Sequence, residues 1–141
     1  MKLEKIFDVK DGKLVKADGN SADGIEISAE NLSWREIEPD AEGGYNEEKL
    51  AGLRLFLKDL EGTGKFVFIN PEKDRDGDFS QFTSAMKHAA RRIKDCTAVA
   101  GFAVPAGTQA ADAAHFMAEL SEKHAHYVFF SRDKIEGTAQ I

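Results

Sequence analysis

The sequence is poor in the residues that give proteins unusual architectures. It has one cysteine in 141 residues, so Cys96 has no partner for a disulfide within the chain, and stability must come from packing. It has only three prolines and no low-complexity tract or internal repeat. With 42% hydrophobic and 31% charged residues, it has the composition of an ordinary globular protein. We therefore expect a chain that is folded nearly throughout, in a reducing compartment.

The chain also lacks an excess of positive charge and long apolar runs. The net charge of −6 argues against nucleic acid and against anionic membranes as partners, because both need a concentrated basic surface. No run is long enough to span a bilayer. The beginning, MKLEKIFDVK, has no apolar core of a signal peptide. We expect a cytoplasmic protein, and a signal peptide removed earlier is the alternative.

Motifs for metals and cofactors are incomplete. Residues 74–78 (DRDGD) have the acidic spacing that begins a calcium loop, but Phe79 replaces the turn glycine and Ala85 replaces the bidentate Glu. The four histidines do not have zinc spacing, and no glycine-rich phosphate loop opens a helix. We predict that the protein uses neither a metal nor a cofactor.

The pattern of apolar residues predicts one α/β domain over residues 1–141. Asp11-Gly12 between short apolar runs predicts a β-hairpin over residues 3–19. From 24 to 131, strands alternate with helices, and Asn46, Asp78 and Thr108 are the expected helix starts. Alternation of this kind predicts a mostly parallel sheet. The predicted strands cover residues 24–28, 65–70, 97–104 and 126–130.

Several segments resemble the cellulase and mannanase family of glycoside hydrolases. Residues 11–19 (DGKLVKADG) resemble the opening hairpin that plugs the bottom of the family's (β/α)₈ barrel. Residues 34–39 (WREIEP) and 44–46 (GYN), with the Leu-rich helix leading to 66–70 (FVFIN), are similar to an early βα unit. Residues 86–102 (MKHAARRIKDCTAVAGF) resemble the helix and strand before the acid/base residue. The resemblance implies the N-terminal half of a TIM barrel.

The sequence departs from that family where catalysis takes place. Members have an Asn-Glu pair at the end of the strand that corresponds to 97–104, but this chain reads FAVPA over 102–106. The nucleophile comes from a later strand, and a whole barrel needs roughly 250 residues. Retaining hydrolysis requires two carboxyl groups about 5–5.5 Å apart. The usual catalytic pair is therefore predicted to be missing.

An incomplete barrel exposes unpaired strand edges and apolar faces. Two copies of the chain are one way to complete it, by pairing edge to edge into an eight-stranded closed barrel. The alternative is a monomer with a small sheet that only shares local patterns with barrels. Both remain open from the sequence.

The predicted ends of the strands carry the candidate site residues, because functional groups in α/β folds gather there. Trp34 is expected to stack on a sugar ring, with the alternative that it packs in the core. Glu72 is the isolated candidate for a catalytic acid or base, with the alternative of a solvated loop residue. The residues expected to bond a ligand's hydroxyl groups are Glu30, Arg35, Glu38 and Asn70.

Three functions are compatible with these observations. The first is a glycoside-hydrolase-like protein without the catalytic pair, which binds a β-linked saccharide or a partner. The second is an active hydrolase of β-linked polysaccharides whose site uses carboxylates such as Glu30, Glu38 and Glu72 and is shared in a dimer. The third is a small α/β regulatory or protein-interaction domain unrelated to carbohydrates.

Overall fold

The computed structural model describes residues 3–141 and contains one parallel sheet. The five strands follow one another across the sheet in chain order. They are β3 (Ile27–Ser33), β4 (Phe66–Glu72), β5 (Val99–Ala103), β6 (Val128–Ser131) and β7 (Thr138–Gln140). All four pairs of neighbours are parallel. The prediction of a mostly parallel α/β fold is confirmed.

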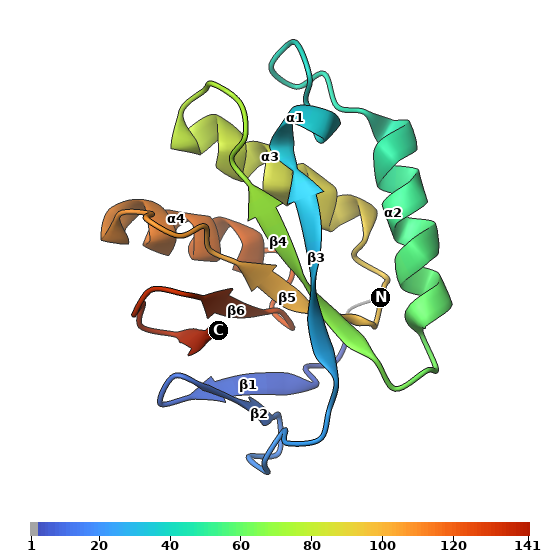
Figure 1. The fold of residues 1–141 in the computed structure, drawn as a ribbon, viewed down its shortest axis with the longest axis vertical. Coiled ribbons are helices and arrows are strands. Elements are labelled where there is room, and N and C mark those ends of the chain that lie inside the picture. The colour runs from blue at the N-terminus through green and yellow to red at the C-terminus, as the bar shows by residue number, and fades with distance from the viewer. Residues whose placement is uncertain (1–2) are drawn as a thin grey trace.

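Helices cover one face of the sheet and the N-terminal hairpin covers part of the other (Figure 1). The helices are α1 (Trp34–Ile37), α2 (Glu47–Leu60), α3 (Phe79–Arg92) and α4 (Ala110–Ser121). The hairpin consists of β1 (Phe7–Lys10) and β2 (Lys13–Lys16), which are antiparallel. In Figure 1, β6 runs between α4 above it and the hairpin below it. We call the hairpin-side face of the sheet the inner face, because it corresponds to the inside of a barrel.

The two faces have separate apolar cores. On the helix side, alternate residues of the strands, such as Val67 and Ile69, pack against α2, α3 and α4. On the inner face, Phe68 and Phe130 stack with their ring centroids 4.6 Å apart, and Phe7 of the hairpin meets Phe66 edge-on. Strands that are buried on both faces read as continuous apolar runs, which is how the sequence revealed β4 and β5.

The helix starts predicted at Asn46 and Asp78 are confirmed. The Asn46 side chain accepts a hydrogen bond from Lys49 N–H and the Asp78 side chain accepts one from Gln81 N–H. Thr108 does not start α4: its hydroxyl donates to the carbonyl of Pro105, and the helix begins at Ala110. The Thr108 hydroxyl is thus engaged in the turn after β5 and does not cap α4.

Two elements were missed by the sequence analysis. The short helix α1 follows β3 directly, and β7 adds a fifth parallel strand beyond residue 131. In addition, β3 extends to Ser33, whereas the predicted strand ended at residue 28. Strand β3 lies at the edge of the sheet, and its residues Ser28 to Asn31 are polar or small. The alternation of apolar residues that would indicate a strand is therefore absent from this part of the sequence.

Cys96 is buried, as expected for a small hydrophobic side chain. Burial, together with the nearby Asp95 carboxylate, raises the pKa of its thiol to about 11. The thiolate is the reactive form, so the Cys96 side chain is inert at neutral pH.

Among residues 3–141, no helix is both long enough and apolar enough to cross a membrane.

Gly101 in β5 lies against the backbone of Val128 in β6, its partner in the sheet. A Cβ at this position would stand 1.6 Å from the carbonyl oxygen of Val128. The register between β4 and β5 also shifts beside this point, between Val67 and Phe68. Only glycine fits, because any side chain would push the two central strands apart.

We therefore expect Gly101→Ala to destabilise the protein by about 3 kcal/mol or more, as overpacking of a tight site does. Gly52→Ala in α2 is the matched control, since a Cβ added there would meet no neighbouring atom within 4 Å and the helix gains from alanine. Its expected effect is a gain of about 1 kcal/mol. Urea unfolding followed by circular dichroism measures both. Equal stability of the two variants would contradict the close packing of β5 on β6.

Candidate functional site

A shallow hollow of about 160 Å³ lies at the carboxyl ends of β4, β5 and β6. Its polar residues are Asn70, two residues before the end of β4, and Arg132, which follows β6. The remaining lining is mainly apolar and includes Pro105 and Ile141. In α/β folds this edge is where ligands bind. We call this hollow the strand-end pocket.

Asn70 is held by a neighbour on the inner face. Its side-chain Nδ2 donates to Oδ1 of Asn31 on β3 at 2.9 Å, and the two residues are partners in the register of the sheet. This bond leaves other amide donors and acceptors of the pair for a ligand. Glu72, two residues further along β4, is on the same face and exposed.

Glu30 does not join this group. On β3 it alternates with Asn31 and shares the face of Leu32, which packs in the helix-side core. Glu30 and Asn70 therefore point to opposite faces of the sheet. The structure does not bring Glu30 to the strand-end pocket.

Trp34 is in the core. It is 0% exposed, and its ring meets Phe82 in a T-shaped arrangement with centroids 5.4 Å apart. The guanidinium of Arg75 lies 5.1 Å and the Lys73 ammonium 5.6 Å from its ring centroid, which places cations over the ring. A sugar cannot stack on Trp34 in this arrangement, so Trp34 has the packing role that was the alternative expectation.

Glu38 is also 0% exposed, and its carboxylate is the centre of a hydrogen-bond network. Oε1 accepts from Trp34 Nε1 at 2.8 Å and from Gln81 Nε2 at 2.9 Å, and Oε2 accepts from Gly43 N–H at 2.9 Å. Arg75 supplies the opposite charge, 3.9 Å from Oε1. A buried carboxylate is costly unless it is paired and hydrogen-bonded, and Glu38 is both. Its role is to fix the loop between α1 and α2.

Arg35 has an exposed side chain, while its backbone is part of a cap. Its N–H donates to Asp74 Oδ1 at 2.8 Å, and the Ser33 hydroxyl donates to the other oxygen of Asp74. Burial alone raises the pKa of Asp74, but these hydrogen bonds outweigh it and hold the pKa below its ordinary value. Asp74 thus serves the start of α1 as a carboxylate and is not available for proton transfer.

The strand ends do not present a pair of carboxylates ready for hydrolysis. Strand β5 ends at Ala103, and Val104 and Pro105 follow. Asp133, after β6, is occupied by a hydrogen bond from Gly107 N–H at 2.8 Å. Glu72 is left as the exposed carboxylate of β4. Within residues 3–141, no cluster of His, Cys, Asp and Glu is suited to hold a metal ion.

Two members of this region were missed by the sequence analysis. Asn31 lies in the part of β3 that the predicted strand left out, and Arg132 lies two residues after the last predicted strand and directly after β6. Both residues follow the ends of predicted strands, where functional groups gather in α/β folds. Considering the residues after every predicted strand would therefore have identified them.

No protein-family model matches the sequence, and no curated protein does so either. Solved structures do match the fold. An endoglucanase of Pseudomonas stutzeri, Cel5A, matches with a TM-score of 0.63 at 16% identity, covering 77% of this chain and 40% of the other. The same enzyme in complex with cellobiose gives 0.61 at 15%. A GH5_18 protein of Bifidobacterium longum subsp. infantis matches with a TM-score of 0.56 at 9% identity, covering 77% of this chain and 34% of that one.

These matches confirm the resemblance to part of a glycoside hydrolase barrel at the level of the fold. The chain spans about a third to two fifths of the length of the structures that it matches. Identities of 9–16% are too low to carry over an activity.

The network around Glu38 predicts a large loss of stability when its carboxylate is removed. We expect Glu38→Ala to lower the free energy of unfolding by about 3 kcal/mol, because the Arg75 charge and three donors lose their partner. Glu42→Ala, in the exposed part of the same loop, should change it by less than about 0.5 kcal/mol. Urea unfolding followed through Trp34 emission tests both. A small effect of Glu38→Ala would show that the network is not needed.

Proposed function

We propose that this chain is a glycoside-hydrolase-like domain that does not hydrolyse and that binds a β-linked saccharide at the strand-end pocket. The observation that carries the proposal is that Glu72 is the exposed carboxylate of β4, that Asp74 just after it is hydrogen-bonded to the start of α1, and that β5 ends in an apolar segment. Retaining hydrolysis needs two carboxyl groups about 5–5.5 Å apart. A single carboxylate is suited to accept hydrogen bonds from a sugar.

The pocket supports saccharide binding through its mixture of groups. The Asn70 amide and the Arg132 guanidinium line the pocket, and the exposed Glu72 carboxylate lies beyond Asn70 on the same strand; all three offer donors or acceptors for hydroxyl groups. Pro105 and Ile141 provide apolar surface beside them for the C–H face of a sugar ring. Trp34 has no part in this site, because it is buried.

An active hydrolase is less favoured by the same geometry. Of the carboxylates expected to share the work with Glu72, Glu30 is on the other face of the sheet and Glu38 is buried in hydrogen bonds. A site shared by two copies would need the other copy to bring a carboxylate to Glu72.

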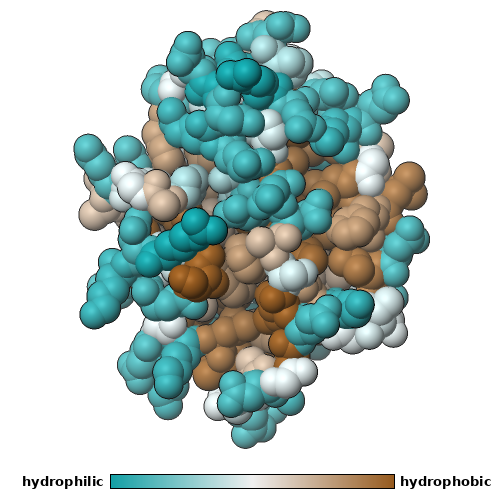
Figure 2. All heavy atoms as spheres, in the orientation of Figure 1, coloured by the Kyte–Doolittle hydropathy of each residue, from teal (hydrophilic) through white to brown (hydrophobic). Residues whose placement is uncertain are grey.

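A protein-interaction role is the second candidate, and one observation favours it. The inner face has an open groove of about 520 Å³ between the hairpin and the sheet, lined by apolar residues such as Ile27, Phe68 and Phe130. Figure 2 shows hydrophobic side chains gathered over the middle of the molecule and flanked by hydrophilic ones. In a complete barrel the remaining strands would cover this face, so a second copy of the chain is the occupant that we propose for it.

The structure affects how such a dimer can form. The chain contributes five parallel strands, so edge-to-edge pairing of two copies would give ten, not the eight of a TIM barrel. At the β7 edge, Gln140 N–H already donates to the carbonyl of Gly12 in the hairpin turn, at 2.9 Å. We therefore propose contact through the groove rather than through this edge.

Analytical ultracentrifugation that finds only monomer at all concentrations would reject the second candidate.

For the saccharide proposal, we expect cellohexaose or mannohexaose to shift the backbone amide resonances around Asn70 and Arg132 in a saturable way. Asn70→Ala and Arg132→Ala should each weaken binding about tenfold, since each loses about one hydrogen bond to the ligand. Asn20→Ala, in an exposed loop after the hairpin, is the control and should bind like the parent. Trp34 emission should stay constant throughout.

The same samples test for catalysis. Release of reducing ends from β-glucan or β-mannan should not exceed the blank, with or without Glu72→Gln. Hydrolysis that Glu72→Gln abolishes would overturn the non-catalytic assignment. The absence of any shift up to millimolar saccharide would reject the binding site and leave the interaction role.

A further inference from the structure

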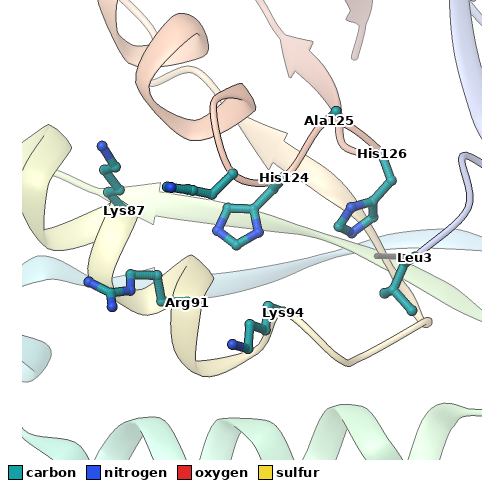
Figure 3. Close-up of a pocket in the computed structure, with 8 residues that line it drawn as sticks. Leu3, Lys87, Arg91, Lys94, His124, Ala125 and His126 are labelled. Atoms are coloured by element: carbon teal, nitrogen blue, oxygen red, sulfur yellow. The ribbon is translucent and has the colours of Figure 1, made fainter. Parts of the chain in front are cut away.

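A second, larger pocket lies at the opposite end of the sheet from the strand-end pocket. It has a volume of about 530 Å³ and lies between the C-terminal part of α3 and the segment that leads from α4 into β6 (Figure 3). Its lining is almost entirely basic: Lys87, Arg91, Lys94, Lys123, His124 and His126, with Leu3 and Ala125. We call it the basic pocket.

Most of this positive charge is not neutralised by the protein. Lys87 lies 3.6 Å from Glu119 and 3.7 Å from Glu122, so it is paired. Within residues 3–141, Arg91, Lys94 and Lys123 have no carboxylate within the 4.0 Å of an ion pair. A protein with a net charge of −6 thus concentrates cations without carboxylate partners, among its described residues, around one cavity.

The simplest explanation for cations here is the C-terminal end of α3. Helix C-termini carry partial negative charge, and basic residues there are common and mildly stabilising. This explains Arg91 and, just beyond the helix, Lys94. It does not explain the two histidines that form the floor of the pocket.

His124 is 3% exposed, and its Nε2 has no hydrogen-bond partner among the described residues. The Nε2 of His126 is likewise buried without a partner there. Figure 3 shows both rings in the pocket, with Arg91 and Lys94 on one side and Leu3 on the other. Buried polar groups without partners are rare in native proteins, and each calls for an explanation. Both atoms are shielded from solvent in this arrangement, so a ligand in the pocket would supply a partner once a ring turns toward it.

The electrostatics of the histidines indicate the charge of that ligand. Burial, assisted by the positive charges of His126, Lys94, Arg91 and Lys87, lowers the pKa of His124 to about 4. The ring is therefore neutral at physiological pH, and in the tautomer protonated on Nε2 it is a hydrogen-bond donor. With lysine and arginine donors around it, the pocket presents donors and positive charge, and no carboxylate is among its lining residues within 3–141.

We propose that the basic pocket binds the phosphate group of a small, soluble phosphorylated molecule. Phosphate oxygens accept several charge-assisted hydrogen bonds at once, which matches a guanidinium, three ammonium groups, of which Lys87 alone is paired with carboxylates, and two imidazoles around one cavity. The volume lies within the range of roughly 300–1,000 Å³ that is typical of small-molecule sites. The site is independent of the saccharide proposal, because it lies at the amino-terminal ends of β5 and β6.

The adjoining cavity indicates what the rest of the ligand is like. A smaller pocket of about 220 Å³ shares Leu3 and His126 with the basic pocket. Its lining is mostly apolar and includes Ile6, Phe7 and Val99. A phosphorylated molecule with an apolar portion next to its phosphate fits the two cavities together.

Isothermal titration with inorganic pyrophosphate at fixed ionic strength tests the phosphate part of the proposal. We expect saturable binding, and the double variant Arg91→Gln/Lys94→Gln should weaken it about tenfold or more. The control is Lys65→Gln/Lys134→Gln, which also removes two positive charges, but from exposed positions outside the pocket. Equal weakening by both pairs would mean a general effect of net charge and would overturn the site.

His124→Phe tests the floor of the pocket, because it keeps an aromatic ring against Tyr127 and removes the nitrogen donors. We expect it to weaken pyrophosphate binding as well, with an unchanged circular dichroism spectrum. If this variant does not fold, the exposed Arg91 and Lys94 pair decides the question alone. No binding of pyrophosphate at millimolar concentration overturns the proposal. Binding only to phosphatidylcholine vesicles that contain phosphatidic acid, and not to pyrophosphate, overturns the soluble ligand in favour of a lipid headgroup.

Discussion

The structure depends on the need of a parallel sheet to cover both of its faces. Crossover helices cover one face automatically, because right-handed connections between successive neighbouring strands all fall on the same side. The other face would be the closed interior of a full barrel. Here the hairpin covers part of it, with Phe7 against Phe66, and leaves the rest as the groove near Phe68 and Phe130. Both cores, and the open groove, follow from this one constraint.

The sequence predicted the fold well where side chains alternate clearly or caps are explicit. Asn46 and Asp78 fixed the starts of two helices, and the apolar runs identified the central strands. It failed at the edges. Strand β7 is only three residues long, and half of β3 is polar, so neither shows a clear alternation of apolar residues. Pattern methods depend on such an alternation, so they miss strands that are very short or largely polar.

The site was harder to predict, because residue type does not reveal which way a side chain points. Trp34 and Glu38 have the chemistry of a carbohydrate site, yet the turn of α1 directs both inward, where they bond to each other. Glu30 and Asn31 are adjacent in sequence, and the pleat of β3 sends them to opposite faces. The basic pocket was not predicted at all, since α3 and the segment before β6 meet only in the folded chain.

The hydrogen bond between Gly12 and Gln140 joins the hairpin turn to the last strand across almost the whole sequence. A contact of such long range is slow to form, because most of the loop entropy must be lost before it is made. During synthesis on a ribosome, the hairpin emerges long before β7 and has no sheet to dock on. The aromatic side chains of the inner face then stay exposed to solvent until the later strands are synthesised. A chaperone that shields apolar segments would have the most time to bind at these side chains.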